Sequence, residues 1–348
     1  MEQNSATHKK SNWRLYLTVG TFAALLILIY TLRQEIVGVI KNLGRVNTIA
    51  LLLIIPMELL NYDSYSRLYR RLFKTLGHKV RYWPMFRLTL ELNFVNHVLP
   101  SGGVSGISYF SLRGRDYGIS TAKSTLAQII KTFLLFISFQ PLLVLGLLLL
   151  AMRGHVNDLV MLVATSIITL LVVGTLLGLY VIESRRRINS TLTYITKFLN
   201  NLVRVVRHDK TDVFDINNAQ KAFNELHDNY QVIKKDWKGL KRPFFYMLVA
   251  NITEVGAVYV VYIAFGQLVN VGAVILAYAV ANFAGLISVL PAGIGIYETL
   301  MTAVLAATGI PAELSIPVTL MYRVVNMFIQ LVPGYFFYQH ALSKRKST

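Results

Sequence analysis

The sequence predicts an all-α integral membrane protein, a polytopic bundle in which several helices cross the bilayer. Hydrophobic residues make up 54% of the 348 residues, and the mean hydropathy is +0.51. Soluble domains are usually about 45–50% apolar. The charges gather between long apolar runs, and about 18 apolar residues are enough to cross a hydrocarbon core of about 30 Å.

The charge and the cysteine content narrow the classes of function. The chain has 35 basic and 17 acidic residues, a net charge of +18. Because the basic residues flank the apolar runs, the preference of Lys and Arg for cytoplasmic loops explains them, and no nucleic-acid partner is expected. The absence of cysteine excludes disulfides, thiolate metal sites and cysteine nucleophiles. No metal-binding motif is present, and we expect no cofactor.

Six apolar segments are predicted to cross the membrane completely. The first follows Lys9, Lys10 and Arg14, as in a signal peptide. It is longer than the apolar core of a signal peptide and lacks a cleavage site, so we expect it to be retained. The six predicted spans are Leu15–Leu32, Val46–Tyr62, Ala122–Met152, Leu159–Ile182, Phe244–Phe265 and Ile316–Tyr338.

The basic stretches predict the orientation of the chain in a cell (plasma) membrane. Lys and Arg are concentrated in residues 63–87, in residues 183–242 and at the end of the chain, in Lys344–Lys346. Positive residues favour the cytoplasmic side, so both termini are expected in the cytoplasm.

Two further apolar segments are interrupted by proline and glycine, which brings the total to about eight. Residues 85–113 break at Leu99–Gly103, and residues 271–308 break at Leu290–Glu298. The helical stretch before the first break covers only about 18 Å, too little for a full crossing. We therefore predict two re-entrant helical hairpins. If both termini are cytoplasmic, the two hairpins enter the membrane from opposite faces, as in the inverted repeats of transporters. Val271–Leu290 is also long enough to cross the membrane fully, so that alternative stays open.

We expect one integral membrane domain, residues 1–348, built from two halves and a linker. Residues 1–182 hold the first broken motif, 99–106, and residues 243–348 hold the second, 290–298. Residues 183–242 carry two apolar stripes at helical spacing, so they are predicted to form amphipathic cytoplasmic helices. A packed linker is favoured over a lipid-sensing surface helix.

The breaks and the charges at membrane depth predict a central polar site. Proline removes a backbone donor and glycine allows close approach, so each break frees N–H groups that can bind an anion such as a lipid phosphate. A charge at the bilayer centre costs roughly 2.5–3.5 kcal/mol and normally pairs or faces water. The alternatives are ordinary turns at the breaks and ion pairs that lock the bundle. The candidate substrate-binding and translocation residues are Asn93, Asn96, Pro100, Ser101, Gly102, Gly103, Arg113, Lys131, Glu254, Pro291, Gly293, Gly295, Glu298 and Arg323.

Residues Asn93–Gly106, Leu290–Glu298, Tyr322-Arg323 and Pro333-Gly334 resemble the membrane domain of the lysylphosphatidylglycerol synthase family. The resemblance implies a flippase-like domain that moves a phospholipid, typically aminoacylated phosphatidylglycerol, from the inner to the outer leaflet. In two-domain synthases a soluble C-terminal acyltransferase domain makes the lysyl lipid. We expect this chain to lack that domain, so lysyl transfer by it alone is not expected.

The leading prediction is a phospholipid translocase whose substrate is an anionic or aminoacylated phosphatidylglycerol-type lipid. One alternative is a membrane enzyme that transfers an aminoacyl or glycosyl group, for which Glu91 and His97 are the only attractive candidates. Another is a partner of a separate soluble lipid-modifying transferase. No catalytic residue is assigned, and the lipid, direction, energy source and oligomeric state stay open.

Overall fold

Every regular element in the described part of the chain is a helix, which confirms the predicted helical membrane bundle. The computed structural model describes residues 23–98, 104–152, 154, 157–191, 193–194, 216–287 and 293–344. The elements are α2 (Arg33–Asn42), η1 (Leu43–Arg45), α3 (Thr48–Leu51), α4 (Ile54–Thr75), α5 (Tyr82–Val98), α6 (Val104–Arg115), α7 (Thr121–Ala151), α8 (Asp158–Ile182), α10 (Ile216–Lys235), η2 (Trp237–Leu240), α11 (Lys241–Ala264), α12 (Val271–Ile287), α13 (Ile296–Ala307) and α14 (Ala312–Lys344).

Four helices in these residues are long and apolar enough to cross a membrane. They are Thr121–Ala151, Asp158–Ile182, Trp237–Ala264 and Ala312–Ser343, and they coincide with four of the six predicted spans. A fifth crossing is possible if Ala23–Thr31 and Arg33–Arg45, which meet at an angle of 54°, form one bent span. The described part of the predicted first span therefore continues past a bend into α2.

The predicted second span differs most from the structure. Residues 46–62 lie in α3 and α4, and α4 continues to Thr75, so the basic residues that follow the apolar run share its helix. Along α4 the side chains of Glu58, Asn61, Ser64 and Ser66 are buried. Polar side chains inside a membrane bundle normally face other helices or a wet cavity. Consequently, α4 is an internal helix with a polar face.

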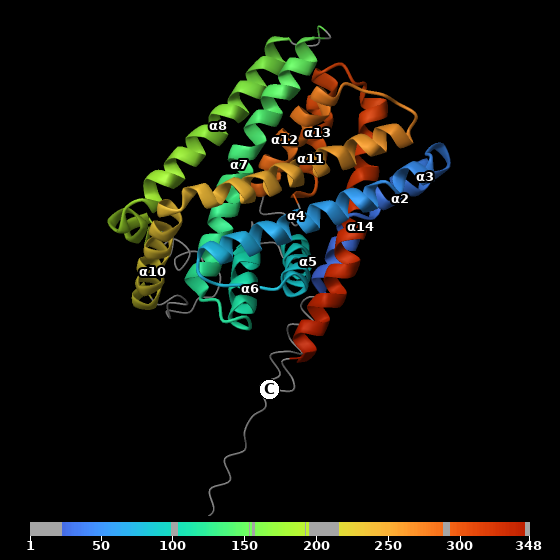
Figure 1. Cartoon of the computed structure of the whole chain (residues 1–348). Coiled ribbons are helices and arrows are strands. Elements are labelled where there is room, and N and C mark those ends of the chain that lie inside the picture. Colours follow the sequence, from blue (N-terminus) through green and yellow to red (C-terminus); the bar gives the residue numbers. More distant parts are fainter. Residues whose placement is uncertain are drawn as a thin grey trace, which may run out of the picture.

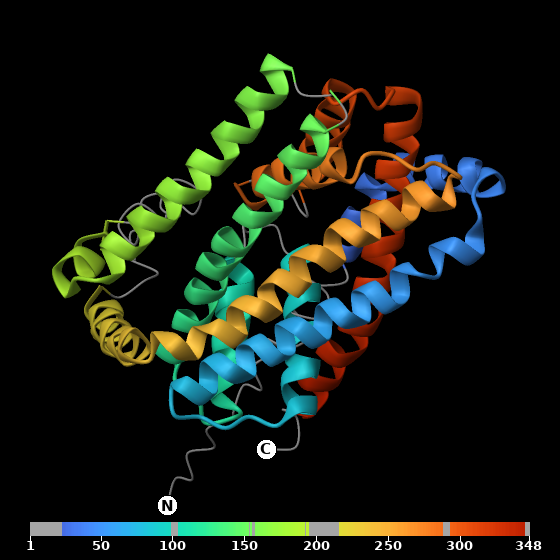
Figure 2. The same cartoon turned by 45° about the horizontal axis from the view of Figure 1, so that its top comes forward.

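The two broken segments form matching units in the two halves. Helices α5 and α12 each have 17 residues, and α6 and α13 each have 12. Helix α5 packs along α14 of the other half, and α12 packs along α7. Figures 1 and 2 show α5 and α6 near one end of the bundle and α12 and α13 near the other, while α7 and α14 run in opposite directions. This reciprocal arrangement is what an inverted repeat predicts.

Glycine allows the reciprocal contacts to be close. A Cβ on Gly272 of α12 would lie 2.2 Å from the backbone oxygen of Gly146 in α7. A Cβ on Gly334 of α14 would lie 2.9 Å from the backbone oxygen of Leu90 in α5. Small residues let helix backbones approach closely in membrane proteins, where packing drives helix association.

The central and outer helices differ in their surroundings. Helices α4 and α11 lie side by side across the middle of the bundle (Figure 2). Helix α8 lies on the outside, and its Leu162, Leu176 and Leu177 are 62%, 60% and 59% exposed, as expected for lipid-facing side chains. Helix α10 covers the second predicted amphipathic stripe, and it packs against α7.

Candidate functional site

A cavity of about 590 Å³ lies where the two halves meet. Helices of both halves line it, including α4, α5 and α7 from the first and α11, α12 and α14 from the second. Six of the predicted site residues line this cavity, and they come from both halves: Asn93, Asn96, Lys131, Glu254, Gly293 and Arg323.

One wall of the cavity, on α7, offers hydrogen-bond donors. The ammonium of Lys131 lies 5.3 Å from the centroid of the Tyr65 ring. Within the described residues it makes no hydrogen bond or ion pair. Gln128, one turn earlier, accepts a hydrogen bond from the Tyr69 hydroxyl at 3.0 Å, while its amide nitrogen is buried without a described partner. Two donors on one face of α7 therefore point to an anionic ligand group.

Another wall offers hydrogen-bond acceptors around Glu254 of α11. Its carboxylate accepts hydrogen bonds from the Asn61 amide at 3.2 Å and from the Tyr322 hydroxyl at 3.0 Å. Asn326 donates in turn to the Tyr322 oxygen at 3.1 Å. The chain of donors holds Glu254 in place between α4, α11 and α14, so both positive and negative groups line one cavity.

Arg323 and Glu298 form an ion pair. Such a pair is one of the two alternatives to a substrate site that the sequence leaves open. The Arg323 Nε lies 2.6 Å from a Glu298 carboxylate oxygen, and the guanidinium lies 4.5 Å from the centroid of the Tyr297 ring. Glu298 also accepts a hydrogen bond from the Gly295 N–H at 2.6 Å. This N–H at the start of α13 is therefore taken by a carboxylate of the protein itself.

Two glycines shape the chain just before α13. Gly293 has a φ of 67° and Gly295 a φ of 84°, both in the left-handed region that glycine adopts without strain. A Cβ on Gly293 would lie 3.1 Å from the Cα of Gly285 in α12. The glycine thus lets the chain fold back against α12, as a hairpin requires.

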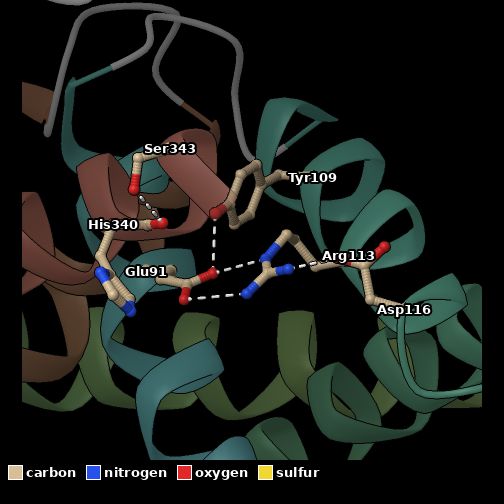
Figure 3. Close-up of polar contacts among 6 residues, drawn as sticks. All are labelled: Glu91, Tyr109, Arg113, Asp116, His340 and Ser343. Carbon is tan, nitrogen blue, oxygen red and sulfur yellow. Dashed lines mark hydrogen bonds and ion pairs between the residues drawn. The ribbon is translucent and has the colours of Figure 1, made fainter. Parts of the chain in front are cut away.

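The predicted residue Arg113 lies outside the cavity lining, in a second ion-pair cluster (Figure 3). Its guanidinium donates to both carboxylate oxygens of Glu91, at 2.8 and 3.2 Å, and also pairs with Asp116. The Tyr109 hydroxyl donates to Glu91 at 2.7 Å. Because Glu91 belongs to α5 and the other residues to α6 or the turn after it, the cluster ties the two arms of the first hairpin together.

Five predicted site residues cannot be placed relative to the cavity. They lie outside the described residues and are Pro100, Ser101, Gly102, Gly103 and Pro291. Their proposed roles stay predictions.

Most of the chain matches one known family. The family model for the lysylphosphatidylglycerol synthase TM region matches residues 16–334. The chain belongs to this family. A role connected with membrane lipids follows from membership of the lysylphosphatidylglycerol synthase TM family, and so does a multi-pass membrane location.

Three archaeal relatives of this family member are UPF0104 membrane proteins. That of Methanocaldococcus jannaschii is 22% identical over 85% of this chain and 86% of its own length. That of Pyrococcus horikoshii is 20% identical over 53% of this chain and 54% of its own. That of Methanothermobacter thermautotrophicus is 30% identical over 27% of this chain and 28% of its own.

Glu58 and the tyrosines of the cavity are not among the site residues predicted from the sequence of this family member. Glu58 is 1% exposed, and its carboxylate accepts a hydrogen bond from the Gln330 amide at 3.0 Å. Tyr62, Tyr65 and Tyr69 line the cavity from one face of α4. The signal was present, because a lone carboxylate in an apolar run, followed by tyrosines at spacings of three and four, marks an inward-facing polar stripe.

Proposed function

We propose that this protein is a flippase-like translocase that moves an anionic or aminoacylated phosphatidylglycerol-type phospholipid between leaflets. The observation that carries the proposal is the polar cavity between the two halves, with the Lys131 ammonium, which makes no ion pair with any described residue, in its wall. Membership of a lipid-related membrane family supports the same substrate class.

The proposed mechanism separates the lipid head group from its acyl chains. A phosphate crossing the hydrocarbon core needs donors to replace the water it loses, because an unpaired charge in a low dielectric is costly. Lys131 supplies a positive charge and Gln128 an amide donor on the same face of α7. The acyl chains remain in the lipid around the exposed apolar helices, so only the head group passes through the cavity.

The contacts of Glu91 weaken the enzyme alternative, whereas those of His97 with the described residues leave one ring nitrogen free. Both Glu91 oxygens already accept hydrogen bonds from Arg113, and one also accepts from Tyr109. His97 Nδ1 donates to the backbone oxygen of Asn93 at 2.8 Å, which leaves Nε2 as the one ring nitrogen that can accept a proton. A general base needs a free lone pair within reach of its substrate. A partnership with a soluble transferase stays compatible with lipid movement.

Lipid movement is expected in liposomes that contain the purified protein and fluorescent phosphatidylglycerol. Chemical quenching from outside should exceed the outer-leaflet half, because the protein exposes inner-leaflet lipid. Lys131→Ala should slow the movement by about tenfold or more, since one charge-assisted hydrogen bond of 1.5–3 kcal/mol is lost. Lys123→Ala changes the same helix outside the cavity lining and should leave the rate unchanged.

Quenching that stops at the outer half for several lipids, with and without a proton gradient, would remove the proposal. Arg323→Ala and Glu298→Ala extend the test to the second half. If movement is normal in the Lys131 variant but lost in these two, the head group passes closer to α13 than we propose.

The proposed cytoplasmic location of the C-terminus can be tested directly because the chain has no cysteine. Ser343→Cys places a thiol near the end of α14, and Met152→Cys, at an 83% exposed position, places one after α7. A membrane-impermeant maleimide added to intact cells should label only Cys at position 152. Labelling at position 343 alone would mean that the chain has the opposite orientation, with its C-terminus outside the cell.

A further inference from the structure

Helix α4, which packs along α11, carries a second buried carboxylate, Glu58. Glu58 and Asn61 are three residues apart on one face of α4, and the Asn61 amide donates to Glu254. Gln330, which donates to Glu58, lines the cavity together with Asn61 and Glu254. Within the described residues, neither carboxylate has a basic group at ion-pair distance. The two carboxylates lie on neighbouring helices, α4 and α11, which pack side by side.

The hydrogen bonds of the two carboxylates differ. Glu58 has a neutral amide donor, Gln330, at 3.0 Å and is almost fully buried. Glu254 accepts hydrogen bonds from three donors, Asn61, Tyr278 and Tyr322. Of the two carboxyl groups, Glu254 therefore has more donors to stabilise a negative charge, and Glu58, with one neutral donor, is the better place for a proton.

Asn326 supplies an independent observation at the same site. Its amide nitrogen donates to Tyr322, which donates to Glu254. Its amide oxygen has no described hydrogen-bond partner although the residue is only 8% exposed and lines the cavity. A buried acceptor of this kind requires a donor, which a cavity water or a hydrated proton provides. An acceptor that no described residue satisfies thus lies in the cavity at the end of the hydrogen bonds that lead to Glu254.

We propose that Glu58 and Glu254 form a proton-binding site, with the proton on Glu58, that couples lipid movement to a proton gradient. Protonation neutralises Glu58, and release returns the proton to cavity water on the other side. Gln330, which donates to Glu58, also accepts a hydrogen bond from Asn93 of α5 at 3.0 Å. A change of charge on Glu58 therefore reaches the first broken segment. The coupling rests on the proposed lipid movement, whereas the proton site does not.

The other titratable groups around the pair must be considered in any pH experiment. Helix α3 carries no titratable side chain, and Lys238 of η2 does not line the cavity. The groups of the surrounding helices that line the cavity are Tyr62, Tyr65 and Tyr69 of α4, His97 of α5, Lys131 of α7, Tyr278 of α12, Tyr297 of α13, and Tyr322 and Arg323 of α14. Of these, only His97 has an unperturbed titration range near neutral pH, so His97→Gln serves as a control.

Infrared spectroscopy of the full chain in lipid nanodiscs tests the proton site without any transport assay. The wild type should show the C=O stretch of a protonated carboxyl group at neutral pH. Glu58→Gln, which keeps the side-chain shape, should abolish this band, and Glu254→Gln should change the pH at which it disappears. Glu183→Gln removes an exposed partner of Lys234. It should change neither the band nor the pH at which the band disappears. A band that persists in Glu58→Gln, or that sodium ions abolish at constant pH, would overturn the proton site.

The coupling has its own test in liposomes of the wild type. An imposed pH gradient should accelerate lipid movement, and Glu58→Gln should lose this acceleration while movement without a gradient continues. A wild-type rate that ignores the gradient would overturn the coupling. If lipid does not move at all, the proposed function fails, yet the infrared result still decides whether the proton site exists.

Discussion

Replacing Arg113 with alanine is expected to lower the free energy of unfolding by about 3 kcal/mol, because it leaves a buried carboxylate without its counter-charge. The side chain of Glu91 is only 3% exposed, and both its oxygens accept hydrogen bonds from the guanidinium. The usual cost of breaking a buried pair is about 3–5 kcal/mol. We expect the lower end because Glu91 keeps the Tyr109 hydrogen bond and can take up a proton. Unfolding in mixed detergent micelles, followed by circular dichroism, measures the change.

Asp116→Ala is the matched control for this change. It removes the other partner of Arg113, but the side chain of Asp116 is 32% exposed, and exposed pairs contribute only about 0–1 kcal/mol. Arg113→Lys should recover part of the loss, since lysine restores the charge but not the two-point contact. Equal losses for Arg113→Ala and Asp116→Ala would mean that the pair with Glu91 contributes little to the hairpin.

Gly272→Ala is expected to destabilise the protein by up to about 3 kcal/mol, the upper end for overpacking. The added Cβ would lie 2.2 Å from the backbone oxygen of Gly146, and a backbone atom cannot rotate away as a side chain can. Helix α12 must therefore separate from α7. The same unfolding measurement applies, and the hairpin contact in the other half gives a second case, since Gly334→Ala meets the backbone oxygen of Leu90 at 2.9 Å.

Gly174→Ala provides the comparison for a helical glycine with room around it. Its nearest neighbour would be a Phe136 ring carbon at 3.7 Å, an ordinary contact. Alanine in a helix interior is favoured over glycine by roughly 0.5–1 kcal/mol, so this variant should be slightly more stable than the wild type. If Gly272→Ala and Gly174→Ala changed the stability equally, the close contact between α7 and α12 would be absent from the protein in micelles.

The sequence predicts the apolar spans well and the internal helices less well. A helix such as α8 lies on the outside of the bundle and is apolar along almost its whole length, so its limits follow from composition. Helix α4 packs inside the bundle, and its polar face carries Glu58 and Asn61. Its apolar run ends near Tyr62 while the helix continues to Thr75, because tertiary contacts rather than lipid decide its length. Composition alone cannot show that limit.

In the candidate site, the sequence likewise predicts some features and misses others. Lys131 and Glu254 stand out as charges in apolar runs, and both line the cavity. The pairing of residues distant in the chain could not be predicted, because it depends on how the helices pack. Arg323 meets Glu298 across a loop, and Arg113 meets Glu91 across the first break. A single sequence shows which residues are costly to bury, and the fold decides which of them neutralise one another.

The packing of α5 against α14 also affects how the protein is made. Helix α5 ends at Val98, but its partner begins only at Ala312. At about 5–20 residues per second, a ribosome needs roughly 10–40 s to make the chain between them. During that time the first hairpin must stay in or near the insertion machinery without its final neighbour. Because Glu91 and Arg113 both belong to this hairpin, its costly charges can cancel before the second half emerges, so the nascent protein need not wait with an unpaired charge in the bilayer.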